Sequence, residues 1–119
     1  MSARRWLAPA AWAAVILTGT SIPGPELPHV PGRTDLAVHF AMYGVLGFLL
    51  ARSARPARAG ALILVVVVAS AFGAMDELHQ RLIPGRTASV DDWTADTVGA
   101  AIGAAALAAA ARKRREPLT

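Results

Sequence analysis

The sequence predicts an all-α integral membrane protein, a bundle of four transmembrane helices with both termini in the cytoplasm. Its 119 residues suffice for one folding unit and not for two, so residues 1–119 form a single predicted domain. Hydrophobic residues make up 55% and charged residues 17% of the chain, against about 45–50% and about 25% in soluble domains. This composition excludes a disordered chain. The apolar residues gather in four stretches: Trp6–Ile22, Leu36–Ala51, Ala59–Met75 and Trp93–Ala111.

Each stretch is long enough to approach the thickness of a bilayer. As an α-helix, 16 to 19 residues span roughly 24–28 Å, close to the roughly 30 Å hydrocarbon core. The alternative is a small soluble domain in which residues 62–68 form a buried strand, because β-branched runs favour strands in water. Four such segments would leave almost no polar surface, and no turn signal occurs over 61–71. The membrane interpretation is therefore preferred.

The first stretch, 6–22, follows Arg4 and Arg5, a pattern shared by membrane helices and cleaved signal peptides. No small-x-small cleavage pattern follows it, so we interpret it as the first membrane helix. The next segment, 23–33, contains four prolines, which fix φ and remove backbone donors. We expect this loop to be extended and semi-rigid.

The orientation of the three later stretches, 36–51, 59–75 and 93–111, follows from the basic residues. With the N-terminus inside, nine basic residues and one acidic residue fall on the cytoplasmic side, against three basic and seven acidic residues outside. The positive-inside rule then predicts that both termini are cytoplasmic. The basic tail, 112–119, is interpreted as a topology determinant and a contact for anionic membrane lipids. It does not indicate nucleic-acid binding.

Polar side chains line up on three of the predicted helices, near their outer ends. Asp35, His39 and Tyr43 follow one another at intervals of four, which places them on one stripe of the second helix. Ionisable side chains cost about 2.5–3.5 kcal/mol at mid-membrane, so we expect such stripes to face one another in a shared, outward-facing polar site. The third and fourth helices contribute Asp76, Glu77, His79, Gln80, Asp92 and Asp96.

Several of these residues also suit purely structural roles. Asp35 suits the cap of the second helix, and Tyr43 suits an interhelical hydrogen bond. Ser89 and Asp92 fit a capping pattern at the start of the fourth helix. These roles and a functional role do not exclude each other.

Two further pairs leave alternatives open. Gly99 and Gly103 lie four residues apart in an Ala-rich helix, which indicates a close-packing face or an interface between copies of the chain. Arg81 and Arg86 carry guanidinium groups that match phosphate or carboxylate groups of a ligand. The alternative is that both arginines pair with the carboxylates beside them.

The sequence assigns no metal and no cofactor. It contains no Gly-rich phosphate loop, no His-Glu-x-x-His pair, no Gly-x-Ser-x-Gly elbow and no cysteine. Histidines and carboxylates could ligate a divalent metal only if separate helices brought them together. Whether the chain is an enzyme stays open. The candidates for acid and base catalysis are His39, Asp76, Glu77 and His79.

Two motifs resemble those of the VanZ-like family of small bacterial membrane proteins, over roughly residues 20–105. The first is Asp35-x-x-x-His39-Phe40-x-x-Tyr43-x-x-Leu46-Gly47-Phe48-Leu49. The second is Asp76-Glu77-x-His79-Gln80-x-x-Ile83-Pro84-Gly85-Arg86-x-x-Ser89-x-x-Asp92-x-x-x-Asp96-x-x-Gly99-x-x-x-Gly103. The chain departs from the family at Leu36, where lysine is common, and at Asp96, where asparagine is common.

The resemblance implies a multi-pass protein of the bacterial cytoplasmic (inner) membrane and cell envelope. The namesake of the family is associated with low-level resistance to the glycopeptide teicoplanin. The resemblance implies no established reaction.

Three functions are consistent with these observations. The first is an envelope protein whose polar site binds a polar or charged group, such as part of a lipid or cell-wall precursor. The second is a membrane-embedded hydrolase or transferase that uses His39 with Asp76 or Glu77 as acid and base. The third is a structural partner of another membrane protein or of a second copy. The predicted binding residues are Asp35, His39, Tyr43, Asp76, Glu77, Gln80, Arg86, Asp92 and Asp96.

Overall fold

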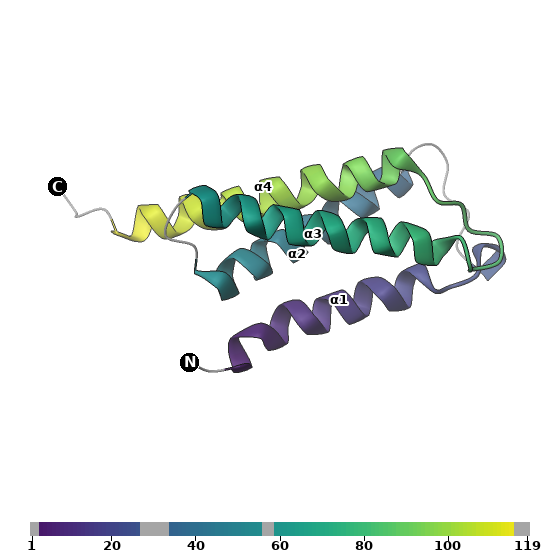
Figure 1. Cartoon of the computed structure of the whole chain (residues 1–119), viewed down its shortest axis with the longest axis horizontal. Helices are drawn as coiled ribbons and strands as arrows, with labels where there is room; N and C mark the ends of the chain where they lie inside the picture. Colours follow the sequence, from purple (N-terminus) through teal and green to yellow (C-terminus); the bar gives the residue numbers. More distant parts are fainter. Residues whose placement is uncertain (1–2, 27–33, 56–58, 116–119) are drawn as a thin grey trace.

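Four α-helices make up most of the chain in the computed structural model, which describes residues 3–26, 34–55 and 59–115 (Figure 1). No strand occurs within these ranges, so the predicted all-α class is confirmed. Parts of the predicted loop at 23–33 and of the predicted tail at 112–119 lie outside the described residues. The helices are α1 (Leu7–Thr20), α2 (Thr34–Ala54), α3 (Ala59–Gln80) and α4 (Val90–Arg115), with 3₁₀ helices η1 (Ala3–Trp6) and η2 (Gly24–Glu26).

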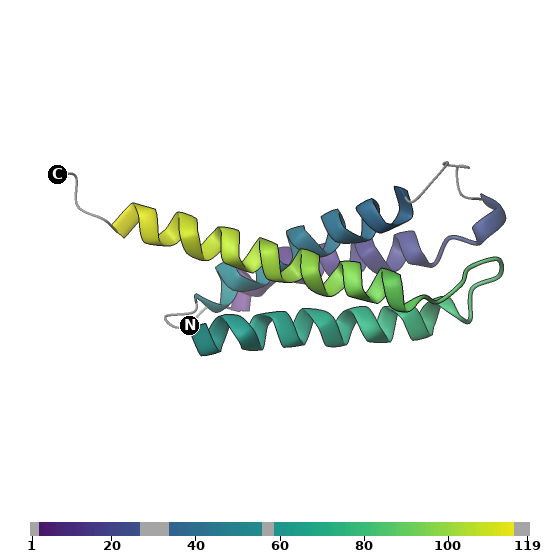
Figure 2. The same cartoon turned by 90° about the horizontal axis from the view of Figure 1, so that it is seen from above.

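Successive helices run in opposite directions, so each end of the bundle collects four helix ends (Figures 1 and 2). We call the end where α1 begins and α4 ends the basic end. We call the opposite end, where α3 ends and α4 begins, the acidic end. The basic end carries Arg4, Arg5, Arg52, Arg55 and Arg112. The acidic end carries Asp76, Glu77, Asp92 and Asp96.

Within the described residues, three helices, not the predicted four, are long and apolar enough to cross a membrane. Their apolar spans are Asp35–Ala54, Gly60–Gln80 and Val90–Arg114. The prediction of a further span at 6–22 is wrong, because α1 has only 14 residues. That length gives about 21 Å of helix, against about 30 Å of hydrocarbon. A 3₁₀ turn precedes α1, and the helix ends at Thr20, where Pro23 and Pro25 follow closely.

The three long helices extend beyond the apolar stretches that predicted them. The polar run that follows Met75 continues α3 by more than one turn, to Gln80. At its start, α4 includes Asp91 and Asp92, and its last described turn reaches Arg115. Carboxylates in the first turn favour a helix start because they face the positive end of the helix dipole. The candidate site residues therefore lie inside helices, except for Arg86, which lies in the connection between α3 and α4.

The glycines of α4 pack against α2 of the same chain. A Cβ atom on Gly103 would overlap the carbonyl oxygen of Gly44, and one on Gly99 would overlap that of Phe40. Only the absence of side chains lets the two backbones approach this closely, as small residues commonly do between membrane helices. An oligomer built through Gly99 and Gly103 would have to displace α2.

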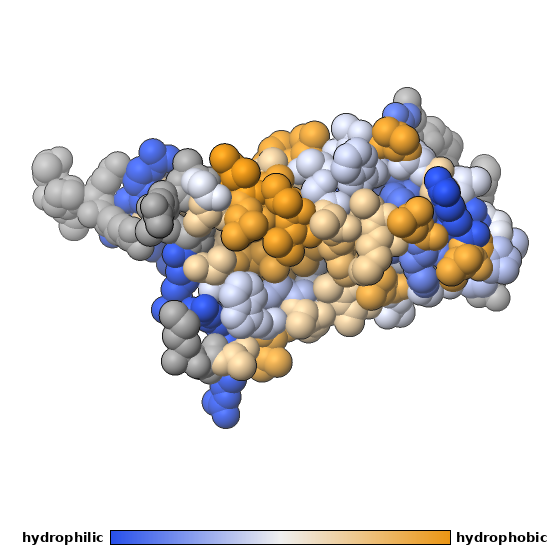
Figure 3. Space-filling model, viewed as in Figure 1, coloured by the Kyte–Doolittle hydropathy of each residue, from blue (hydrophilic) through white to orange (hydrophobic). Residues whose placement is uncertain are grey.

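Large apolar side chains cover the outside of the bundle. Ile63 and Leu64 on α3 are each more than 60% exposed, and Ile102 on α4 is 53% exposed. Figure 3 shows hydrophobic residues over the middle of the molecule and hydrophilic residues toward both ends. Such an apolar girdle suits contact with lipid tails, and together with the three long helices it indicates a multi-pass membrane protein.

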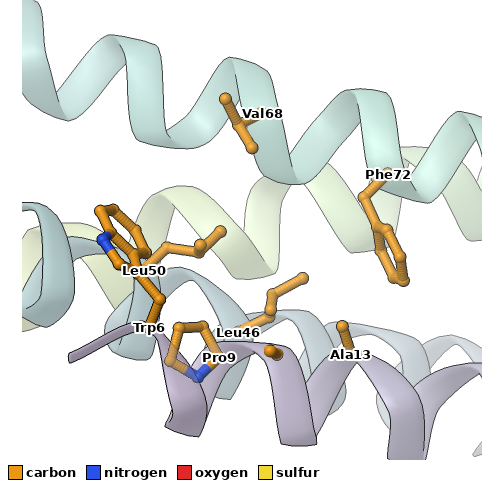
Figure 4. Close-up of a pocket in the computed structure, with 8 residues that line it drawn as sticks. Trp6, Pro9, Ala13, Leu46, Leu50, Val68 and Phe72 are labelled. Carbon is orange, nitrogen blue, oxygen red and sulfur yellow. The ribbon is translucent and has the colours of Figure 1, made fainter. Parts of the chain in front are cut away.

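The short helix α1 packs along α2 and α3. The indole nitrogen of Trp12 donates a 2.8 Å hydrogen bond to the carbonyl oxygen of Met42 on α2, and Ile16 is fully buried. Nearer the basic end the contact opens into an apolar cavity of about 250 Å³. Figure 4 shows Leu46 and Leu50 of α2 and Phe72 of α3 lining it across from α1.

Candidate functional site

His39 and Asp96 form the centre of a buried polar cluster at the acidic end. The Nδ1 atom of His39 on α2 lies 2.8 Å from Oδ1 of Asp96 on α4. His39 is 6% exposed and Asp96 is fully buried. His39 lies five residues into α2, so the cluster lies about 8 Å inside the helix start.

Two more carboxylates approach the same imidazole ring. Glu77 on α3 places Oε1 3.9 Å from Nδ1 of His39, and Asp92 on α4 places Oδ2 3.9 Å from Nε2. Glu77 and Asp92 are also buried. Two helices, α3 and α4, therefore surround the imidazole of α2 with three carboxylates. We call these four residues, His39, Glu77, Asp92 and Asp96, the His39 cluster.

Neighbouring groups hold the Glu77 side chain in place. The backbone N–H of Ser89 donates to Oε2 at 3.0 Å, and the amide of Gln80 donates to Oε1 at 3.2 Å. The hydroxyl of Ser89 accepts the backbone N–H of Asp92 at 3.1 Å, which confirms the predicted cap at the start of α4. The cap thus positions both Glu77 and the first turn of α4.

Asp76 belongs to a second, adjoining network. Its Oδ1 accepts a hydrogen bond from the hydroxyl of Thr20 at 2.7 Å, and its Oδ2 accepts one from the hydroxyl of Tyr43 at 3.2 Å. Asp76 and Tyr43 are fully buried, and Thr20 is 1% exposed. This network ties α1, α2 and α3 together at the acidic end.

The three residues of the predicted polar stripe on α2 do not all face the same environment in the structure. His39 and Tyr43 point into the bundle, as predicted, but Asp35 in the first turn of α2 is exposed. On α3, His79 is half-buried, and no hydrogen bond to Nδ1 occurs within the described part of the chain. His39 pairs with Asp96, and Asp76 pairs with Thr20 and Tyr43, so the suggested combination of His39 with Asp76 does not form.

Sequence reasoning missed Thr20. Its hydroxyl also lies within hydrogen-bonding distance of carbonyl oxygens of its own helix, at Ile16 and Leu17, and a threonine at the end of an apolar helix is usually explained by such local bonds. No residue pattern in the sequence pairs Thr20 with Asp76, because the contact depends on how α1 packs against α3. Arg81 is exposed and Arg86 is half-buried, and no ion pair joins either to a carboxylate among the residues described.

The arrangement offers two kinds of chemistry. The imidazole, held through Nδ1 by Asp96, can accept or donate a proton at Nε2. The carboxylates outnumber the imidazole three to one, so the cluster favours a cation or a hydrogen-bond donor as its ligand.

Comparison with known proteins agrees with the residue motifs. A search of curated proteins and a search of solved structures each returned no match. The family model described as VanZ/LLP1 matches residues 8–111, which includes all four helices almost completely. The chain therefore belongs to the VanZ/LLP1 family.

Proposed function

We propose that this membrane protein binds a polar or charged group of an envelope lipid or cell-wall precursor at the His39 cluster. The observation that carries the proposal is the meeting of His39, Glu77 and Asp96 from three different helices in one buried cluster. Ionisable groups in membrane helices are expensive, and they usually mark ligand or ion sites. A purely structural core would do better with apolar side chains of similar volume.

The proposal includes the location and orientation of the chain. We place the protein in the bacterial cytoplasmic membrane, with the basic end in the cytoplasm and the acidic end at the outer face. The basic residues gathered where α1 begins and α4 ends support this orientation. The His39 cluster then lies within the outer part of the membrane, where headgroups of envelope lipids can reach it.

The test is lipid and metabolite analysis of the purified protein by mass spectrometry. The His39→Gln variant keeps a polar side chain of similar length but loses the imidazole. The control is Ser70→Ala, which removes another interhelical hydrogen bond, 2.8 Å to Thr97, that involves no residue of the His39 cluster. We expect a molecule that copurifies with the wild type and the control and is lost from His39→Gln. Equal retention by all three proteins would contradict the proposal.

The resemblance to a resistance-associated family extends the proposal to teicoplanin. Expression in a susceptible bacterium should raise the minimal inhibitory concentration of teicoplanin, and His39→Gln should abolish the increase at an unchanged protein level. An increase that survives the substitution would separate resistance from the His39 cluster.

A second candidate function is a membrane-embedded hydrolase or transferase. The specific observation that favours it is the 2.8 Å pairing of His39 Nδ1 with Asp96, which orients the ring and leaves Nε2 to act as acid or base. If the protein is an enzyme, the wild type should chemically convert the molecule that copurifies. The Asp96→Asn variant, incubated with the same molecule, should leave it unconverted.

A further inference from the structure

We infer that His39, Glu77 and Asp96 bind a divalent metal ion. One ligand-capable atom from each of these residues can be chosen such that all three lie within 4.8 Å of one another. The three residues come from α2, α3 and α4, so the folded bundle meets the condition under which the sequence allowed a metal site. All three are buried. To hold an ion, Glu77 would move closer to the imidazole from its present 3.9 Å, and the ion would replace the hydrogen bond between His39 Nδ1 and Asp96 Oδ1.

An unpartnered oxygen provides independent support. Asp96 is fully buried, and its Oδ2 has no hydrogen-bond partner within the described residues. A buried polar atom without a partner is unfavourable, and native proteins rarely leave one unexplained. An ion bound by both oxygens of the Asp96 carboxylate would satisfy Oδ2 together with Oδ1, the oxygen that faces His39.

The charge of the cluster points the same way. Each of the four residues of the His39 cluster is less than one-tenth exposed, and three of them are carboxylic acids. Within the described ranges, the only ion pairs of these acids are those with His39. A divalent cation would neutralise charge that a single imidazole leaves uncompensated.

The donor set indicates which metals fit. One imidazole nitrogen with two carboxylates suits first-row ions such as Zn²⁺ or Mn²⁺ better than Mg²⁺, which prefers oxygen ligands alone. Asp92 lies 3.9 Å from Nε2, the other nitrogen of His39, and is not one of the three residues that could hold the ion. The hydrogen bonds from Gln80 and Ser89 to Glu77 orient a ligand, as outer-shell groups do in known metal sites.

The metal site adds a mechanism to the proposed function. Metal binding itself does not depend on that function, but the role given to the metal below does. A bound cation with an open coordination position would attract the phosphate or carboxylate of a precursor into an otherwise acidic cluster. This explains how a site rich in carboxylates can receive an anionic group.

The test is metal binding by the purified protein. After treatment with EDTA and its removal, the protein is titrated with Zn²⁺ or Mn²⁺, and bound metal and the unfolding temperature are measured. We expect one ion per chain and a rise in unfolding temperature for the wild type. Asp96→Asn should lose both, whereas Asp91→Asn, which removes an exposed carboxylate from the same helix, should keep both.

Two outcomes would overturn the metal site: no ion on the wild type, or equal binding by Asp96→Asn. A molecule that copurifies in a His39-dependent manner without metal would leave the proposed function standing. The two ideas therefore fail separately.

A separate cavity at the basic end carries a second inference. Its volume is about 430 Å³, and it lies between η1, the start of α1 and the end of α2. Of the described residues, seven line it, and none of these seven is acidic. Four of them are arginines, namely Arg4, Arg5, Arg52 and Arg55.

The apolar cavity of Figure 4 shares three of its lining elements, η1, α1 and α2, with this basic cavity. Consecutive residues line the two: Arg5 and Leu49 line the basic cavity, and Trp6 and Leu50 line the apolar one. A cationic pocket next to an apolar pocket matches a molecule with an anionic head and a hydrocarbon tail.

We propose that the two cavities together hold an anionic glycerophospholipid. The phosphate would lie among the arginines, because guanidinium groups bind phosphate in a fork. One acyl chain would fill the space between α1 and α3. The position of the arginines at one end of the bundle agrees with attraction to anionic headgroups at a membrane surface.

The test uses the purified protein and lipid vesicles. Phosphatidylglycerol should raise the unfolding temperature of the wild type more than phosphatidylcholine does. The double variant Arg5→Gln/Arg52→Gln should lose the difference, and Arg112→Gln/Arg114→Gln, at exposed positions on α4, should keep it. An equal response to both lipids, or an equal rise with inorganic phosphate alone, would overturn the lipid assignment.

Discussion

The hydroxyl of Thr20, the last residue of α1, lies 2.7 Å from Oδ1 of Asp76, a carboxylate with no exposed surface. This contact joins the short helix α1 to the helix that carries Glu77. The contact gives α1 a structural role in the bundle, although α1 is not one of the helices long and apolar enough to cross a membrane. The geometry of the acidic end thus depends on all four helices.

Replacing Thr20 with valine should destabilise the protein while keeping its shape. The variant removes one donor to a buried carboxylate, which costs about 1–3 kcal/mol. Thr18→Val is the matched control, because the exposed Thr18 hydroxyl bonds, within the described part of the chain, to the carbonyl oxygen of Ala14 on its own helix and to no carboxylate. Unfolding of both variants in detergent measures the difference, and equal stability of the two would contradict the role of Thr20.

A methyl group at Gly103 should disrupt the contact between α2 and α4. The added Cβ would overlap backbone atoms of Gly44, so the helices must separate. We expect a loss of about 1–3 kcal/mol, as for other overpacked sites. Gly60→Ala should be neutral or stabilising, since nothing lies within 4 Å of its Cβ position. Thermal unfolding of both variants is the measurement, and an unaffected Gly103→Ala would show that the helices are not in close contact.

Cysteine labelling tests the proposed orientation. The chain contains no cysteine, so single substitutions report one position each. Thr87→Cys, in the connection between α3 and α4, should react with an impermeant reagent added to intact cells. Lys113→Cys, near the end of α4, should react only after permeabilisation. The reverse pattern would invert the proposed topology.

The positions of the helices in the sequence could be predicted better than the contacts between the helices. Leu36–Ala51, Ala59–Met75 and Trp93–Ala111 each lie within one observed helix, because uninterrupted apolar runs of this length have few other folds. The stretch at 6–22 is equally apolar, but the proline-rich sequence beyond Thr20 ends α1 early. Hydrophobicity alone does not distinguish a helix of 14 residues from a full span.

The candidate site was only partly predictable, for a geometric reason. The spacing of His39 and Tyr43 correctly places both on one buried face, because i and i+4 positions share a helix face. Which carboxylate each one meets depends on how the helices are packed and offset along their axes. The close glycine contact of α2 with α4 brings His39 to Asp96, and Tyr43 lies against α3 at Asp76.

The central claim is that His39 and Asp96 act as one ligand-binding unit. The most direct measurement is retention of the copurified molecule by His39→Gln, Asp96→Asn and the double variant, with Ser70→Ala as control. If the two residues form one site, each single variant should lose nearly all of the molecule, and the double variant should lose no more. Full retention by either single variant would contradict the claim, as would two partial losses that simply add in the double variant.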